Sequence, residues 1–213
     1  MTARHFDRRR VIAGLGTTVL MGCGRRGAFV PTAPGQSDRI LRSVLYVTNR
    51  IADPASPSAV ARGSTLRFSL LDIATPRDRL AGSLDFTGPD AFTLADRTPV
   101  DQADLADALH QSTVDKKPGH TRLMLWVHGF NNTPAEAVHR QVQVVQDLAH
   151  AGATVSFVWP SAARSAGYIH DRDSALHARD LLADLLVQLR AAWSGEIVVV
   201  AHSLGAFLTL EAI

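Results

Sequence analysis

The most regular pattern of apolar and polar positions begins after residue 121. Three short runs are almost entirely apolar, and two longer segments with helical spacing lie between them; the runs are Leu123–Val127, Thr154–Val158 and Ile197–Val200. Strands that are apolar at nearly every position are buried on both faces, as in a parallel sheet covered by helices. The pattern therefore predicts an α/β fold with a mostly parallel sheet and flanking helices.

The two longer segments carry the signals that begin and end helices. Residues 133–136 read Thr-Pro-Ala-Glu, a capping box with proline in the first helical position, and Gly152 provides a stop. The second helix is expected to begin near Asp173 and to end at Gly195. Apolar residues recur along each helix at a spacing that makes one face apolar: Val138, Val142, Val145 and Ala149 in the first, and Leu182, Leu185, Leu186 and Leu189 in the second. Both helices are thus expected to cover the sheet.

The first part of the domain is less regular. Ile40–Val47 and Leu66–Ile73 are expected to be strands, and Ser83–Phe86 is a candidate for a third. Residues 75–120 are rich in aspartate and turn residues, with one short helix expected over residues 101–110. This stretch carries no functional motif.

The N-terminus has the features of an export signal. Three arginines at residues 8–10 precede an apolar run, Val11–Gly22, which is too short to span a bilayer but suits a signal peptide. Residues 8–12 resemble a twin-arginine signal and residues 20–23 a bacterial lipobox, which would make Cys23 a lipidated residue. We therefore expect an exported lipoprotein, anchored to the membrane on the periplasmic or extracellular side. The alternative is a buried free thiol at Cys23.

Domain organisation and charge follow from this division. Residues 1–23 are interpreted as the signal, 24–39 as a Pro- and Gly-containing linker, and 40–213 as one domain of ordinary globular composition. Without the first 23 residues the chain has 18 basic and 19 acidic residues, a net charge of −1. Since phosphate binding by nucleic-acid-binding proteins needs clustered Lys and Arg, we expect no nucleic-acid partner. The oligomeric state is not indicated.

The candidate nucleophile is Ser203. The predicted strand that ends at Val200 is followed by Ala201–Gly205 and then by an expected helix over Ala206–Ile213. This strand–turn–helix context is the one a nucleophile elbow requires, with small residues two positions before and after the serine. Gly205 meets that need, and Ala201 exceeds the usual glycine by one methyl group. The Leu204 amide at the start of the helix is positioned to stabilise an oxyanion.

A second turn follows the predicted strand Leu123–Val127. It reads His128-Gly129-Phe130-Asn131-Asn132. In alpha/beta hydrolases a His-Gly turn at this place supplies the other oxyanion amide, here that of Phe130. His128 and Gly129 would shape this turn, and His202 and Gly205 would support the elbow. A serine between small residues is a weak signal alone, and the ordered pair of turns is a stronger one.

Four motifs in this order resemble a bacterial alpha/beta-hydrolase family of unknown function: residues 128–132, Trp159-Pro160-Ser161, residues 171–175 and the Ser203 elbow. The resemblance covers roughly Val44 to Ile213. It implies an esterase- or lipase-like serine hydrolase that cleaves a small-molecule or lipid carboxyl ester through an acyl-enzyme at Ser203. No cofactor and no metal are implied.

The general base and the acid of a catalytic triad are not accounted for. In this fold they follow the serine along the chain, so we expect a domain that is incomplete after the elbow, and little activity from these 213 residues. The upstream histidines are poor bases: His202 should point away from the serine, His128 should shape the oxyanion turn, and His139 and His150 are expected on a covering helix. The next strands would also be missing, which would leave the Ile197–Val200 strand as an exposed edge.

Two alternatives stay open. His170 and His177, with Asp171 and Asp173, could form a metal site or an unusual triad, although carboxylates at this place also suit a helix N-terminus. The second alternative concerns function. A non-catalytic, membrane-anchored lipoprotein could use the hydrolase scaffold as a binding module.

Overall fold

The computed structural model describes residues 26–35, 38–53, 56–114 and 122–213. The interpretations placed on residues 1–23, including Cys23, lie outside these ranges. Within them, no helix is both long and apolar enough to cross a membrane.

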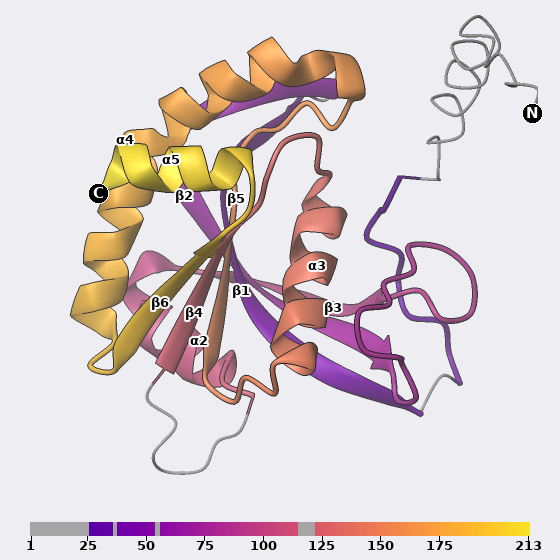
Figure 1. Ribbon diagram of the computed structural model, residues 1–213. Helices are drawn as coiled ribbons and strands as arrows, with labels where there is room; N and C mark the ends of the chain where they lie inside the picture. The colour runs from indigo at the N-terminus through magenta and orange to yellow at the C-terminus, as the bar shows by residue number, and fades with distance from the viewer. Residues whose placement is uncertain (1–25, 36–37, 54–55, 115–121) are drawn as a thin grey trace, which may run out of the picture.

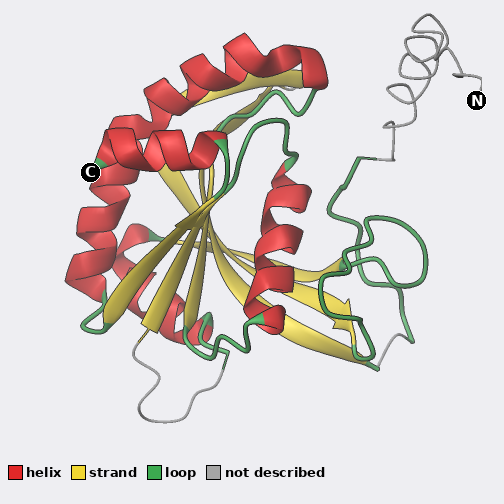
Figure 2. Ribbon diagram, in the orientation of Figure 1, coloured by secondary structure: helices red, strands yellow, loops and turns green. Residues whose placement is uncertain are grey.

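A six-stranded sheet forms the centre of the molecule, in the order β3-β2-β1-β5-β4-β6 (Figure 1). Helices and short 3-10 turns connect its later strands (Figure 2). The strands are β1 (Arg39–Asp53), β2 (Ser56–Pro76), β3 (Thr93–Val100), β4 (Arg122–Val127), β5 (Ala153–Val158) and β6 (Glu196–Ala201). The helices are η1 (Gln102–Asp104), α2 (Leu105–Gln111), α3 (Pro134–Asp147), η2 (Ser165–Gly167), α4 (Tyr168–Ala192) and α5 (Leu204–Ala212).

Strand β1 joins an antiparallel half of the sheet to a parallel half. It pairs antiparallel with β2, which pairs antiparallel with β3. On its other side it pairs in parallel with β5, and β5, β4 and β6 are parallel to one another. The carboxyl ends of β1, β4, β5 and β6 therefore meet at one edge, where open α/β sheets place their functional sites. Among the described strands, β6 lies at the sheet edge and pairs with β4 alone.

Helices cover both faces of this sheet, which confirms the predicted α/β class (Figure 1). Helix α3 packs on one face, where Val138 and Val142 are fully buried against Val44 and Leu71. Helices α2, α4 and α5 share the opposite face. Apolar side chains from all of them meet the sheet there, among them Leu109, Leu182, Leu185 and Leu208. Because both faces are covered, β4 and β5 are buried at nearly every position, and their alternate residues from Leu123 to Val127 and from Ala153 to Phe157 join the cluster under α2, α4 and α5.

Several element boundaries differ from the prediction. Ser83–Phe86 is a loop, because Gly82 and Gly88 adopt positive φ on either side and turn the chain. The third strand is instead Thr93–Val100, which the sequence did not indicate because five of its eight residues are exposed. Such a polar edge strand lacks the alternation that marks a half-buried one.

The two covering helices also have unexpected ends. Helix α4 begins at Tyr168, five residues before Asp173, and Gly167 at its N-cap makes no side-chain capping bond, so no signal marked it. Helix α3 has the predicted capping box but ends at Asp147. His150 consequently lies beyond the helix and not on it.

Candidate active site

The turn between β6 and α5 holds Ser203 in a backbone conformation that residues with a side chain rarely adopt. Ser203 has φ 53° and ψ −121°, and its side chain is exposed. Surrounding contacts enforce this geometry: the His202 amide donates to the Val127 carbonyl at 3.0 Å, and the Gly205 amide donates to the His202 carbonyl at 2.9 Å. An exposed serine at a strained junction of strand and helix has the geometry of a nucleophile elbow.

Close approach of the helix to β4 explains why a glycine stands at position 205. A Cβ atom there would collide with the carbonyl oxygens of Val127 and His128. At position 201 the constraint is weaker, because Ala201 pairs with Val127 in the sheet and its methyl group packs against the core. The departure from glycine at Ala201 is therefore accommodated without displacing the elbow.

The turn at residues 128–132 lies directly against the elbow. A Cβ atom on Gly129 would come within 3.1 Å of Ser203 Cβ and 2.8 Å of His202 Nδ1. Phe130 follows at the next position, and Leu204 is the first residue of α5. Within the described ranges, neither the Phe130 amide nor the Leu204 amide donates a hydrogen bond. Two unused N–H donors next to a candidate nucleophile are what an oxyanion hole requires.

The fully buried carboxylate of Asp171 in α4 holds this turn in place. Its Oδ2 accepts the Asn131 amide at 2.9 Å and the Ser161 hydroxyl at 2.6 Å, and its Oδ1 accepts the Ala162 amide at 2.6 Å. Ser161 Oγ in turn accepts the Asn132 amide at 3.2 Å. One carboxylate thus joins α4, the loop after β5 and the turn after β4. The sequence suggested a helix-terminus role for Asp171 and gave no sign of these contacts across the fold.

Two arginines also form hydrogen bonds to these loops. Arg50, at the end of the parallel part of β1, donates to the Ser161 carbonyl at 2.5 Å. Arg26 donates to Asn131 Oδ1 at 2.8 Å and to the Asn131 carbonyl at 2.6 Å, and it forms an ion pair with Glu136 at 2.6 Å. Asn131 has φ 60°, so these bonds stabilise a residue in the left-handed region. Neither arginine belongs to a sequence motif, and only the fold brings them to the turn.

His128 is buried and structural. Its ring stacks on Trp159 with centroids 4.7 Å apart, and Trp159 Nε1 donates to the His128 carbonyl at 2.8 Å. Its Nδ1 and Nε2 lie 2.9 Å and 3.2 Å from the carbonyl oxygens of Gly129 and Trp159. Burial lowers the pKa of His128 from 6.5 to about 4, so the ring is neutral near pH 7.

The other histidines do not complete a triad within the described ranges. Ser203 Oγ makes no hydrogen bond there, and the His202 ring lies against Gly129. His139 is buried on α3 among Phe29, Phe86 and Phe92. These residues therefore do not supply the imidazole that would accept the Ser203 proton.

The alternative metal site is not assembled. His177 Nε2 lies 3.3 Å from the Gly63 carbonyl, and the partly exposed Asp173 pairs with Arg172 at 3.1 Å. His170 Nδ1 lies 3.4 Å from Asp171 Oδ1, a contact within the network described above. No group of three or more His, Cys, Asp or Glu side chains that could hold a metal ion occurs in the described part of the chain.

Comparison with known proteins agrees with this geometry. No curated protein and no solved structure matches the chain. Residues 102–213, more than half of the chain, match the family model "Alpha/beta hydrolase of unknown function (DUF900)". The match is narrower than the expected resemblance from Val44 onward, and it includes the elbow, the 128–132 turn and Asp171. The chain therefore belongs to this family of alpha/beta hydrolases of unknown function.

Proposed function

We propose that the protein is a serine hydrolase that cleaves carboxyl esters, with Ser203 as its nucleophile. The observation that carries the proposal is the strained, exposed Ser203 packed against a turn with a free amide. Ser203 Oγ would attack the ester carbonyl carbon while its proton passes to a base. The alcohol would leave with a proton, and water would then hydrolyse the acyl-enzyme.

The amides of Phe130 and Leu204 would hold the oxyanion formed during this attack. A single preorganised donor of this kind lowers the barrier by about 3 kcal/mol. Gly129 and Gly205 permit the approach of the two turns. Asp171 and Arg50 would act as positioning residues, because they fix the loops without facing the nucleophile.

The base and the acid are proposed to come from polypeptide other than the described residues. Without them, the described residues are expected to turn esters over slowly, since loss of the base leaves only the contribution of the oxyanion hole and substrate binding. The absence of an imidazole on Ser203 Oγ within the described ranges also favours one competing function. In that function the scaffold is a non-catalytic binding module.

Labelling with an alkyl fluorophosphonate, with and without added imidazole as an external base, separates the two functions. A hydrolase is expected to label at Ser203, faster as imidazole is added, and the Ser203→Ala variant should not label. Ser165→Ala, a change at another exposed serine, serves as the matched control and should label like the parent. A folded chain that stays unlabelled at high imidazole concentration would instead support the binding module.

We further propose that the protein is exported and anchored through a lipid on Cys23. The support is the order of the sequence features: arginines, a short apolar run and a cysteine after Gly22. An ester at the membrane surface, a lipid ester included, would then be within the enzyme's reach.

A further inference from the structure

A second region of the molecule has the character of a binding site. A pocket of about 650 Å³ lies over the antiparallel half of the sheet, on the side that α3 covers. Tyr46 of β1 lines it and is only 4% exposed. The strand register aligns Tyr46 with Ser69 of β2, and Ser69 with Pro99 of β3, so the three strands form a continuous wall.

Three arginines surround this pocket: Arg50, Arg67 and Arg97. The guanidinium carbon of Arg97 lies 5.3 Å from the centroid of the Tyr46 ring. All three guanidinium groups lie close enough to the Tyr46 hydroxyl to favour its ionised form, yet burial outweighs them and raises the pKa of Tyr46 above 10. The phenol is therefore neutral. Among the described lining residues, Asp101 is the one carboxylate, which leaves an excess of positive charge.

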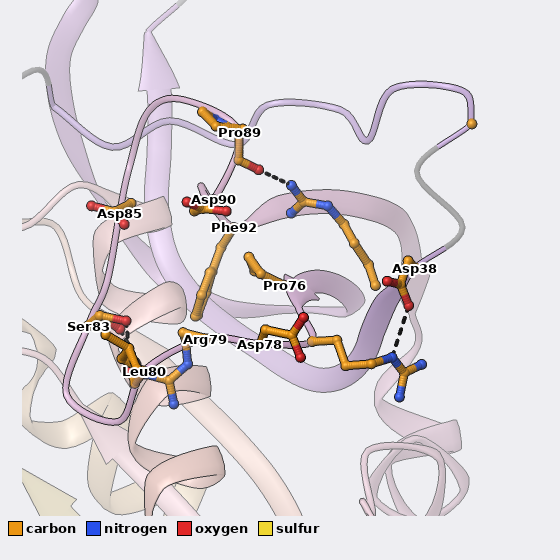
Figure 3. Close-up of a pocket in the computed structure, with 13 residues that line it drawn as sticks. Asp38, Pro76, Asp78, Arg79, Leu80, Ser83, Asp85, Pro89, Asp90 and Phe92 are labelled. Atoms are coloured by element: carbon orange, nitrogen blue, oxygen red, sulfur yellow. Dashed lines mark hydrogen bonds and ion pairs between the residues drawn. The ribbon is translucent and has the colours of Figure 1, made fainter.

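A second pocket of similar volume lies at another part of the surface, and its arginines are paired with other groups of the protein. It measures about 610 Å³, and Asp38, Asp78, Asp85 and Asp90 lie around it (Figure 3). Its arginines are engaged: Arg77 pairs with Asp38 at 3.0 Å, and Arg39 donates to the carbonyls of Pro89 and Ala91. Charge and hydrogen bonding are balanced within the protein there.

Two of the three arginines of the first pocket, Arg67 and Arg97, are not balanced in this way. The guanidinium groups of Arg67 and Arg97 donate no hydrogen bond to any residue in the described ranges, and neither forms an ion pair there. Their two planar forks project from neighbouring strands β2 and β3 on the same face of the sheet. Arg97 is aligned with Leu71, four residues from Arg67 along β2, and both guanidinium groups act on the Tyr46 hydroxyl between them. A guanidinium group with free donors is suited to bidentate binding of a carboxylate or phosphate.

We propose that this arginine pocket, defined by Arg50, Arg67 and Arg97, binds an oxyanion that carries an apolar body. The carboxylate or phosphate head would take the N–H groups of Arg67 and Arg97. The body would lie against apolar groups that line the same pocket on the α3 side, which are the rings of Phe29, Tyr46, Pro99 and Pro134. The family match begins at residue 102, so both arginines lie outside it. The site does not depend on the proposed chemistry at Ser203.

Isothermal titration calorimetry on the full chain tests the proposal. Octanoate, octyl phosphate, octanol and inorganic phosphate are the probes, and a Ser203→Ala background excludes acylation of the serine. At least one octyl anion is expected to bind, and more tightly than octanol and inorganic phosphate. The tighter of the two anions then identifies the head as carboxylate or phosphate.

Three variants locate the binding. Arg67→Gln and Arg97→Gln should each weaken it by about tenfold, because each removes a charge-assisted bidentate contact. Arg179→Gln, a change at a partly exposed arginine of α4 that pairs with Asp180, is the matched control and should not weaken it. Arg50 is left unchanged because it also holds the Ser161 loop.

Two results would overturn the proposal. One is unchanged affinity in the double variant at Arg67 and Arg97, and the other is binding of octanol as tight as that of both anions. Should the variants fold poorly, the salt dependence of the unsubstituted chain decides. Affinity for the octyl anion must fall as ionic strength rises, because exposed charges are screened, and salt-independent binding would contradict the site.

Discussion

The Asp171 carboxylate accepts the backbone N–H of Asn131 at 2.9 Å, and so fixes a turn that lies 40 residues earlier in the chain. With the Ser161 hydroxyl and the Ala162 amide it has three donors and is fully buried. Replacement by asparagine puts an amide N–H against at least one of these donors. The Asp171→Asn variant is expected to lose about 2 kcal/mol of unfolding free energy, measured by urea denaturation.

The neighbouring Asp173 provides the control for that experiment. It lies on the same helix, but its side chain is 45% exposed and forms an ion pair with Arg172. Asp173→Asn should change the unfolding free energy by less than about 0.5 kcal/mol. Equal losses in the two variants would show that Asp171 has no special part in holding the turn.

Backbone strain at Ser203 predicts an unusual response to glycine. At φ 53° a glycine is tolerated where alanine keeps the strain. Ser203→Gly should therefore be more stable than Ser203→Ala by about 1 kcal/mol. At Ala206, an ordinary helical position of α5, a change to glycine should instead destabilise by about 0.5 to 1 kcal/mol. Thermal and chemical denaturation of the three variants measure these differences. If glycine were less stable than alanine at both positions, the result would argue against strain at Ser203.

Positions 205 and 201 should respond differently to exchange between glycine and alanine. Gly205→Ala forces a methyl group against two backbone carbonyls. We expect it to cost more than about 2 kcal/mol of unfolding free energy and to slow fluorophosphonate labelling. Ala201→Gly should cost about 1 kcal/mol or less and leave labelling intact. If both variants label equally, the close approach at Gly205 does not shape the elbow.

The buried His139 predicts a loss of stability in acid. Burial lowers its pKa from 6.5 to about 4 in the folded protein. Between these values the unfolded chain binds more protons than the folded one, so the unfolding free energy falls as the pH falls from 6.5 to 4. The loss from this group approaches about 3 kcal/mol, and the similarly lowered pKa of His128 adds to it.

Substitution within the aromatic surroundings of His139 isolates its share. The His139→Phe variant should show a flatter dependence of unfolding free energy on pH between 4 and 6.5. Val142→Ala, which weakens the same helix contact without removing a titratable group, should lower stability and keep the slope. A slope that is unchanged by His139→Phe would mean that the imidazole titrates alike in both states.

Lipidation of Cys23 is open to direct measurement. In a bacterial host that exports the full chain, labelled palmitate should enter the protein, and Cys23→Ser should abolish both labelling and membrane association. Because the chain has a single cysteine, no other thiol can replace it. Met21→Ala, which brings a smaller residue to a lipobox position, should still be labelled. Palmitate incorporation in Cys23→Ser would refute the assignment.

The parallel half of the fold and both turns of the candidate site could be predicted from the sequence, because they depend on local signals. Buried strands are apolar throughout, the α3 cap is a four-residue pattern, and the elbow needs small residues at fixed spacing. Strand Thr93–Val100 and the start of α4 at Tyr168 could not, since an exposed edge strand and an uncapped helix lack such signals.

The contacts that support the site could not be predicted from the sequence either. Asp171 contacts Asn131 at a separation of 40 residues, Arg50 contacts Ser161 at 111 and Arg26 contacts Glu136 at 110, and no short motif encodes a partner at such distances. The charge pattern was misleading in a similar way. A net charge of −1 after residue 23 gave no reason to expect a cationic pocket, which forms because β1, β2 and β3 place their arginines on one face.

The contact between Gly205 and the β4 turn also bears on how relatives of this chain can be found. Only the second small position of the elbow lies against backbone carbonyls, whereas the first tolerates a methyl group. A search pattern that demands glycine at both positions would pass over this protein. A pattern that allows alanine before the serine, requires glycine after it and adds an upstream His-Gly turn would retain it.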